Sequence, residues 1–334
     1  MDKELRKELH RDELGEALTE ARGAHNIVMN VSGTAYADTY SALSAVPELS
    51  VHHIPSGKRT TVHSARSLDA YQMIPPELVE MKAPDGVLVR GMLLKPEPLD
   101  AGRKYPVVIY VYGGPHAPTI RNSWGGSRYL FHQYLAQQGF VVMYVDDRAS
   151  SVLGHRQEAY LQKNYGPTAL ADHRVAVEYL RSLPYVDSSR IAIWGASGGG
   201  FSTCFALTHS DLFKVGIAVA PVTDWRLYDS IYTERYMGLP SSAKATEDEP
   251  QEDPYDTTSC VKAAGNLSGR LLLVHGDADD NVHIQNTVQL IHALVEAGKP
   301  YDLWIYPRKT HSLRGGATQL HLYRGMAEYL KSHL

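Results

Sequence analysis

Apolar and polar positions change their spacing twice along the 334-residue chain. From Lys3 to Ala21, leucines recur every four or five residues among charged side chains, which predicts a surface helix that stops near Gly23. Residues 26–63 instead show short strand-like runs separated by Ser-Gly and Pro-Ser-Gly turns. We expect a small antiparallel sheet of four strands here: Asn26–Val31, Thr34–Tyr40, Glu48–Ile54 and Arg59–His63.

After Pro75-Pro76, uninterrupted apolar runs alternate with helix-like stretches. Such runs are typical of strands that are buried on both faces of a mostly parallel sheet covered by helices. The predicted strands are Val87–Leu94, Val107–Val111, Val141–Val145, Ile191–Trp194, Val215–Val219, Leu271–Val274 and Asp302–Tyr306. The predicted helices include Leu170–Leu183, Gln285–Ala297 and Gln319–Leu334. The pattern therefore predicts an α/β fold over this part of the chain.

One of these strands leads directly into a glycine-rich turn, Gly195-Ala196-Ser197-Gly198-Gly199, which a helix-like stretch follows. A G-x-S-x-G turn between a strand and a helix is the nucleophile elbow of α/β-hydrolases. The glycines allow close packing of the turn, so that the hydroxyl of Ser197 projects from the sheet. The N–H of Gly198 then lies near the helix N-terminus, where it can bind a developing oxyanion. We therefore predict the α/β-hydrolase fold, with helices on both faces of the sheet.

This fold orders its catalytic residues along the chain as serine, acid and histidine. Asp277, Asp279 and Asp280 all follow the predicted strand Leu271–Val274, and spacing alone leaves the choice among them open. His311 follows the last predicted strand, so it is the candidate base that takes the proton of Ser197.

Composition and charge exclude several classes of function. Hydrophobic residues make up 43% of the chain, which is enough for a large core, and the net charge of −4 comes without a basic run typical of nucleic-acid binding. No apolar run approaches the roughly 18 residues of a membrane span. Cys204 and Cys260 have neither disulfide-framework nor metal-ligand spacing. Protein side chains fill every chemical role, so neither a metal nor an organic cofactor is expected.

The charged N-terminus lacks the apolar core of a signal peptide. As written, the sequence predicts a cytoplasmic protein. A periplasmic or secreted location is the alternative if the true N-terminus lies upstream.

Four motifs carry a family resemblance: Tyr110–Pro115, Val219–Trp225, Tyr228–Pro240 and Asp279–His283. They resemble the dipeptidyl peptidase IV group of the prolyl oligopeptidase family, and the resemblance runs from about Gly23 to the C-terminus. In that family a β-propeller precedes a hydrolase domain that cleaves short peptides after proline or alanine. The resemblance implies three parts: an N-terminal helix over 1–22, a remnant propeller blade over 23–75, and the catalytic domain over 76–334.

The resemblance also selects residues that chemistry alone leaves open. It implies Asp279 as the triad acid, and Tyr112 as an oxyanion donor beside the Gly198 N–H. Asn281 would bind the carbonyl oxygen of the substrate's N-terminal residue. An apolar and aromatic pocket for the residue before the cleaved bond would consist of Val222, Trp225, Tyr228, Tyr232 and Val282. A homodimer, formed in that family through the last helix and a propeller arm, is expected as well.

The sequence departs from that family at several points. Ala196 and Gly198 stand where aromatic residues commonly flank the serine, and Ser312 stands where glycine is usual. The stretch Asp147–Ser151 replaces a glycine-rich turn. The paired glutamates that bind the substrate amine in the family, and its propeller arginine, belong to propeller blades without a counterpart in these 334 residues.

Three functions are therefore open: a dipeptidyl peptidase-like serine peptidase, a broader serine hydrolase acting on esters or acyl-peptides, and an inactive binding or dimerisation module. The peptide-cleaving function is the main prediction.

Overall fold

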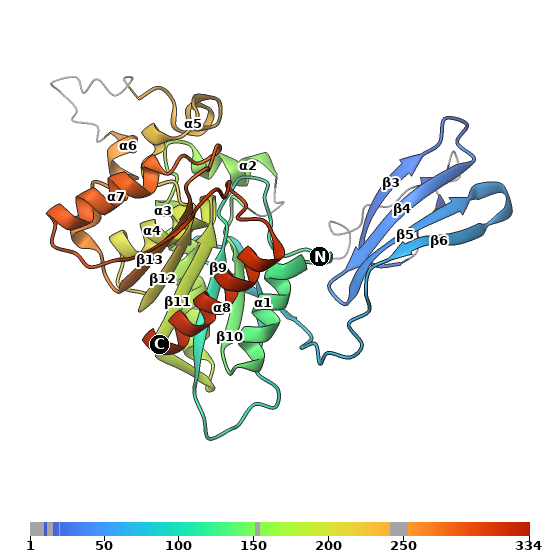
Figure 1. Ribbon diagram of the computed structural model, residues 1–334, viewed down its shortest axis with the longest axis horizontal. Coiled ribbons are helices and arrows are strands. Elements are labelled where there is room, and N and C mark those ends of the chain that lie inside the picture. The colour runs from blue at the N-terminus through green and yellow to red at the C-terminus, as the bar shows by residue number, and fades with distance from the viewer. Residues whose placement is uncertain (1–9, 12–15, 20, 151–153, 241–252) are drawn as a thin grey trace. The chain divides into compact units, whose positions relative to one another are not determined.

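The computed structural model of the protein describes residues 10–11, 16–19, 21–150, 154–240 and 253–334 (Figure 1). Two units emerge from the packing of the chain. One comprises the described residues up to Pro75 together with Arg121–Gln133, and the other comprises Pro76–Ile120 together with the described part of Tyr134–Leu334. Helix α1 (Gly126–Gln137) contributes residues to both units.

The first unit contains the predicted antiparallel sheet. Its strands are β3 (Ala24–Met29), β4 (Ala35–Ala42), β5 (Ala45–His53) and β6 (Lys58–Ser64), paired in chain order. Gly33 and Gly57 take positive φ values of 67° and 65° at the turns, a conformation that glycine adopts without strain. The four-stranded N-terminal sheet is thus confirmed, whereas its origin as a propeller blade stays a prediction.

The N-terminal helix predicted over Lys3–Ala21 is wrong where the structure describes it. Strand β1 (His10–Arg11) pairs antiparallel with β2 (Glu16–Ala17). Residues 3–9, 12–15 and 20 of the predicted helix lie outside the described residues. Gly15 in the middle of the segment lowers its helix propensity by about 1 kcal/mol relative to alanine, and helices are stabilised mainly by packing of a broad apolar face. A thin stripe of leucines does not provide such a face.

The second unit is built on an eight-stranded sheet in the order β14-β13-β12-β11-β9-β10-β8-β7. All pairings from β14 through β10 are parallel, and β8 and β7 add antiparallel pairings at the edge. The strands are β7 (Glu77–Lys82), β8 (Leu88–Leu94), β9 (Tyr105–Val111), β10 (Val141–Asp146), β11 (Val186–Ala196), β12 (Val215–Val219), β13 (Arg270–Gly276) and β14 (Asp302–Tyr306). The predicted α/β fold with a mostly parallel sheet is confirmed. Only the edge strand β7 was not predicted.

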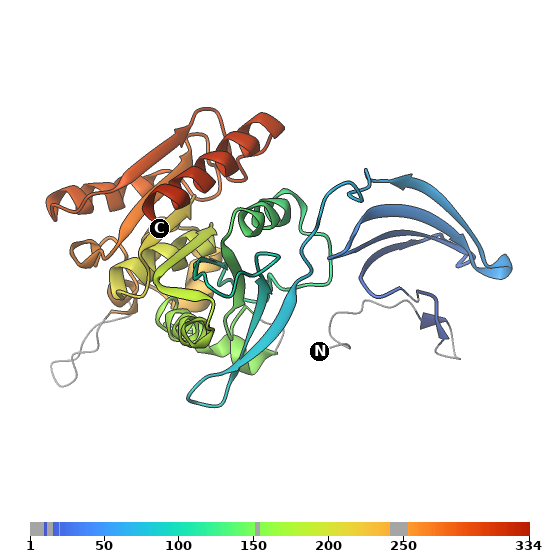
Figure 2. The same cartoon turned by 90° about the horizontal axis from the view of Figure 1, so that it is seen from below.

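Helices cover both faces of this sheet. Helices α3 (Pro167–Ser182) and α4 (Gly198–His209) pack on one face, and α8 (Gly316–His333) lies on the opposite face (Figure 2). Every residue of β9 and of β10 is buried, which explains their uninterrupted apolar sequences. The remaining elements of this unit are α2 (His155–Glu158), η3 (Ala159–Leu161), η4 (Trp225–Leu227), α5 (Ser230–Met237), α6 (Pro254–Thr257), η5 (Ala264–Asn266) and α7 (Gln285–Glu296).

None of the helices in the described part of the chain is both long enough and apolar enough to cross a lipid bilayer.

The parallel order brings distant parts of the sequence to one edge of the sheet. The segments after β9, β11, β13 and β14 all leave from the carboxyl ends of neighbouring parallel strands. These segments begin with Tyr112, Ser197, Asp277 and Pro307. The carboxyl edge is where ligands bind in open α/β sheets.

Candidate active site

Ser197 lies between the last residue of β11 and the first residue of α4. Its φ of 59° and ψ of −117° place it in a strained region for a residue with a side chain. Two hydrogen bonds hold it there, because its N–H donates to the carbonyl of Val219 at 2.8 Å and its own carbonyl accepts from the N–H of Phe201 at 2.9 Å. Strain that the surrounding structure maintains is common at functional sites.

The glycines around Ser197 differ in what they allow. A β-carbon on Gly199 would lie 2.2 Å from the carbonyl oxygen of Val111, and one on Gly195 would lie 2.5 Å from the carbonyl oxygen of Gly199. Both positions therefore exclude any side chain. A β-carbon on Gly198 would meet only Tyr112, at 3.2 Å from its carbonyl oxygen and 4.0 Å from Cζ, the carbon that bears the hydroxyl. The phenol of Tyr112 thus lies beside the N-terminus of α4, next to the serine.

Asp279 and His311 come together from the loops that follow β13 and β14. Nδ1 of His311 lies 2.8 Å from Oδ2 of Asp279. The other carboxylate oxygen accepts the N–H groups of Asn281 and Val282, both at 3.0 Å. The side chain of Asp279 is fully buried, whereas that of His311 is 19% exposed. An ionised carboxylate of this kind orients the imidazole and leaves Nε2 available for chemistry.

His275 is a contributor to this arrangement that the sequence did not reveal. Its ring is completely buried, and Nε2 lies 3.2 Å from Oδ2 of Asp279 and 2.8 Å from the carbonyl of Val282. Nδ1 lies 2.7 Å from the hydroxyl of Thr287. Burial lowers the pKa of His275 below its usual value, so the ring is neutral at neutral pH. Its single N–H, on Nε2, donates to the carbonyl of Val282 and lies beside the Asp279 carboxylate. Its signal in the sequence was only a histidine inside an apolar strand.

The two neighbouring aspartates are placed differently from Asp279. Asp277 and Asp280 are both exposed, and Asp277 accepts a hydrogen bond from the N–H of Arg308. Among the three carboxylates that follow β13, Asp279 alone contacts His311 in the described structure.

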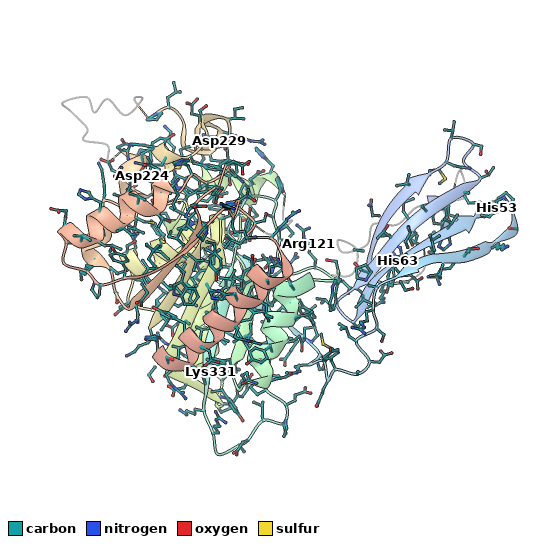
Figure 3. The ribbon with its side chains drawn as sticks, viewed as in Figure 1. His53, His63, Arg121, Asp224, Asp229 and Lys331 are labelled. Atoms are coloured by element: carbon teal, nitrogen blue, oxygen red, sulfur yellow. The ribbon has the colours of Figure 1, made fainter. Side chains whose placement is uncertain are left out.

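Three of the predicted pocket residues form one aromatic group. Trp225 and Tyr232 stack with their centroids 6.0 Å apart, and Tyr228 meets Tyr232 edge-on at 5.4 Å. Val222 and Val282 are buried in the same apolar cluster as Trp225. The helix that carries Tyr232 begins here because the carboxylate of Asp229 accepts the Tyr232 N–H at 2.8 Å, a helix N-cap (Figure 3).

Asn281 joins the acid loop to this aromatic group. The hydroxyl of Tyr228 donates to Oδ1 of Asn281 at 2.9 Å. This bond orients the side-chain amide, whose NH₂ group is then the donor that remains for a ligand.

Tyr165 completes the group from a segment that showed no periodic pattern. It is 2% exposed, packs on Trp225 at a centroid distance of 4.3 Å, and its hydroxyl lies 2.5 Å from the hydroxyl of Tyr232. Burial chiefly raises the pKa of Tyr232, and the nearby phenol of Tyr112 adds to the rise. Tyr112 therefore lies near the aromatic group as well as near Ser197.

The loop that departs from the resembled family contains a buried carboxylic acid. Asp147 is 1% exposed, and its Oδ1 accepts the N–H groups of Ala149 at 3.0 Å and Ser150 at 2.8 Å. Oδ2 has no hydrogen-bond partner among the described residues, and a β-carbon on Gly113 would lie 3.2 Å from it. Burial raises the pKa of Asp147 to about 7, so it is partly protonated at neutral pH.

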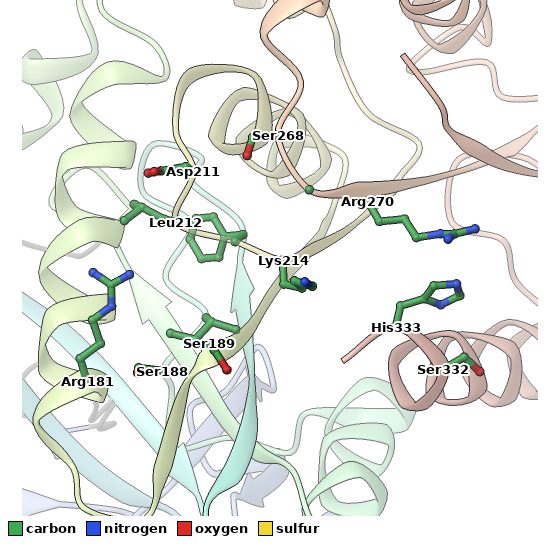
Figure 4. A pocket seen from close by; sticks show the side chains of 13 residues that line it. Arg181, Ser188, Ser189, Asp211, Leu212, Lys214, Ser268, Arg270, Ser332 and His333 are labelled. Carbon is green, nitrogen blue, oxygen red and sulfur yellow. The ribbon is translucent and has the colours of Figure 1, made fainter. Parts of the chain in front are cut away.

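A cavity of about 680 Å³ lies at the other end of the sheet (Figure 4). Its lining includes Ser189 in β11, Lys214 before β12, Arg270 in β13 and His333 in α8. These residues mark the amino ends of the parallel strands, so the cavity is separate from the candidate active site. Among the residues in the described ranges, no three His, Cys, Asp or Glu side chains converge as a metal-ligand set.

Comparisons with known proteins identify the family to which the chain belongs. Residues 128–334 match the model of the prolyl oligopeptidase family. A mouse protein named dipeptidyl peptidase 8 is 38% identical over 300 residues, which are 87% of this chain and 33% of that protein. A protein of Metarhizium robertsii named probable dipeptidyl-aminopeptidase B is 38% identical over 238 residues, 70% of this chain and 25% of that protein. The chain thus spans about a third or less of these relatives' length.

A solved structure supports the same relationship. Dipeptidyl peptidase 4 of Porphyromonas gingivalis superposes with a TM-score of 0.87 at 35% sequence identity, over 97% of this chain and 46% of that one. The sheet order and the strained serine turn are consistent with these matches. The chain belongs to the prolyl oligopeptidase family.

Proposed function

We propose that the protein is a serine peptidase that cleaves short peptides after proline or alanine through an acyl-enzyme. The observation that carries this proposal is the pair formed by His311 and the buried carboxylate of Asp279, at the sheet edge where Ser197 occupies a strained turn. Relatives named dipeptidyl peptidases add support from sequence and fold.

In the proposed reaction, Oγ of Ser197 attacks the carbonyl carbon of the substrate while Nε2 of His311 takes the hydroxyl proton. The Tyr112 hydroxyl and the Gly198 N–H bind the resulting oxyanion. The tetrahedral intermediate collapses, the C–N bond breaks, and the imidazolium gives its proton to the departing amine. A water molecule then adds to the ester by the same route, which releases the acid and restores Ser197. Asp279 stays ionised and stabilises the imidazolium throughout.

The aromatic group explains the proposed preference for proline. A pyrrolidine ring is flat, apolar and lacks an N–H after it forms a peptide bond, so it binds by contact with rings such as Trp225 and Tyr232. Alanine fits the same space. The amide of Asn281 would bind the preceding carbonyl oxygen, and its hydrogen bond from the Tyr228 hydroxyl supports this assignment.

For a protein that consists of these 334 residues alone, we expect only a weak requirement for a free amine. The paired glutamates that bind the amine in the resembled family have no recognised counterpart among these residues. We infer that an N-blocked Gly-Pro amide is cleaved within about tenfold of the unblocked one, a difference of roughly 1.4 kcal/mol or less. A preference above about a hundredfold for the free amine would contradict this inference and indicate another acid at the site.

Chromogenic Gly-Pro, Ala-Pro, N-blocked Gly-Pro and simple aryl ester substrates test the proposal, with fluorophosphonate labelling as an independent readout of an activated serine. We expect labelling and amide cleavage in the wild type and neither in Ser197→Ala. Hydrolysis of esters without cleavage of any Pro or Ala amide would favour the broader serine hydrolase. An absence of both labelling and hydrolysis would favour the binding module.

A further inference from the structure

Glu158 is a buried carboxylate outside the groups used above. It is the last residue of α2 and only 8% exposed. Its Oε2 lies 2.7 Å from Nε2 of His116, whose side chain is 55% exposed. His155 contacts the same oxygen only at 3.8 Å and is 95% exposed. The contact with His116 is therefore the specific one.

His116 belongs to the loop that carries the phenol of Tyr112. Its φ of 51° is a strained conformation for a residue other than glycine, and its N–H donates to the carbonyl of Ala149 at 3.4 Å. Between the two residues, Gly113 also has a positive φ, 74°, and the carbonyl of Gly114 accepts the N–H of Ala117 at 3.2 Å. The segment from Gly113 to His116 is thus a tight turn whose far end contacts Glu158.

The position of the Tyr112 ring depends on the position of this turn. A β-carbon on Gly114 would lie 2.6 Å from Cε1 of Tyr112, so the ring packs directly against the backbone of the turn. A displacement of the turn would therefore displace the hydroxyl. A shift of about 1 Å in a positioning group can reduce turnover by up to about a hundredfold.

The other oxygen of Glu158 faces the aromatic helix α5. Oε1 accepts a hydrogen bond from the hydroxyl of Tyr236 at 3.4 Å. Tyr236 in turn contacts Tyr232 with ring centroids 5.1 Å apart. Glu158 thus links the turn that holds Tyr112 to the helix that holds the proposed substrate pocket.

We propose that Glu158 and His116 are positioning residues that hold the Tyr112 hydroxyl in register with the aromatic pocket. This inference rests on the proposed function, because it assigns Tyr112 the role of oxyanion donor. Neither residue touches the substrate. Their effect on turnover passes entirely through Tyr112.

A double-mutant cycle tests this role: Glu158→Ala, Tyr112→Phe and the combination, with kcat and KM measured on a Gly-Pro amide. Glu158→Ala should lower kcat by about tenfold with KM changed by less than about twofold. In the Tyr112→Phe background, the same change should lower kcat by less than about twofold, because the hydroxyl that Glu158 positions is already absent.

Two histidine variants distinguish loss of the Glu158–His116 contact from a general folding defect. His116→Asn is too short to reach Glu158, and asparagine tolerates the left-handed conformation of this position. It should reproduce the kcat loss of Glu158→Ala. His155→Asn is the matched control, because His155 contacts the same carboxylate of Glu158 only at 3.8 Å and is 95% exposed. This variant should leave kcat within about twofold of wild type.

The outcomes separate this inference from the proposed function. Full multiplicative losses in the double variant, a loss confined to KM, or equal effects of His116→Asn and His155→Asn would each overturn the positioning role while the enzyme stays active. A wild-type protein that cleaves no substrate would instead refute the proposed function. Melting temperatures of the variants show whether a kcat loss accompanies unfolding, and a loss explained by unfolding overturns the inference as well.

Discussion

The two ends of the eight-stranded sheet both carry polar side chains, but these are organised in opposite ways. At the carboxyl end, the side chain of Asp279 is fully buried and contacts His311 and His275 as well as two backbone N–H groups. At the amino end, Arg270 is 53% exposed and pairs with Asp302 at 2.9 Å beside the cavity in Figure 4. Burying a polar group costs free energy unless hydrogen bonds replace those it made with water, whereas an exposed ion pair contributes little to stability.

The difference lies in how the side chains of the two regions are enclosed and connected. The candidate active site is recognised by backbone strain at Ser197, by enclosure of Asp279 and by rings that contact one another. The amino-end cavity lacks these features among its lining residues in the described structure, although it is lined by several cations. Substitutions at the two ends should therefore have very different effects on activity.

The largest effect is expected for Asp279, the proposed triad acid. Asp279→Asn should lower kcat by about 10⁴-fold, because the amide favours the wrong tautomer of His311 and no longer stabilises the imidazolium. Steady-state kinetics on a Gly-Pro amide measure this loss. Asp277→Asn and Asp280→Asn are the matched controls, since both side chains are exposed, and should change kcat by less than about tenfold. An equal loss at Asp277 would show that the acid has been assigned wrongly.

A smaller loss is expected at the proposed oxyanion donor. Tyr112→Phe retains the ring that packs on Gly114 and removes the hydroxyl. Loss of one oxyanion donor typically lowers kcat by about 10²–10³-fold, or roughly 3–4 kcal/mol of transition-state stabilisation, with little change in KM. If only KM rises, Tyr112 binds the ground state of the substrate instead.

The buried acid near the site predicts a pH-dependent effect on stability. The pKa of Asp147 in the folded protein is about 7, above its usual value of 3.8. As pH rises through this interval, the unfolded chain releases the proton while the folded protein retains it, so the free energy of unfolding falls. Below the lower value both states are protonated and the stabilisation is fully present. Asp147→Asn cannot ionise and should lack this fall.

Melting temperatures of wild type and Asp147→Asn at pH 5 and pH 8 measure the effect. We expect the melting temperature of the variant, relative to that of the wild type, to be higher at pH 8 than at pH 5. Parallel pH profiles for the two proteins would mean that Asp147 is ionised in the folded state at both.

The smallest effect is expected at the amino-end cavity. Lys214→Gln and Arg270→Gln each remove one charge from its exposed lining. Neither lies near the carboxyl ends of the strands, so kcat and KM on a Gly-Pro amide should stay within about twofold of wild type. A tenfold loss of kcat in either variant would show that the amino end of the sheet affects catalysis, and the two ends would then not differ as described.

The sequence by itself determined the elements whose local pattern and final environment agree. Strands β12 and β14 match their predicted bounds, because each is a short run bounded by turn residues. The serine turn was also predictable, since a β-carbon on Gly195 or Gly199 would overlap backbone atoms and only glycine fits. That the segments of Ser197, the three aspartates after β13 and His311 share one edge follows from the topology of a parallel sheet. Spacing alone left the choice among the three aspartates open.

Only the tertiary structure decided the features that depend on contacts between distant segments. The leucine stripe over 3–21 favours a helix locally, but strands form at 10–11 and 16–17, because helix formation depends on a packing partner. Tyr165 and Glu158 make their specific contacts with neighbours 67 and 42 positions away, namely Tyr232 and His116. A pattern read along the chain reports spacing within one element, whereas burial and hydrogen bonding are set by which elements meet.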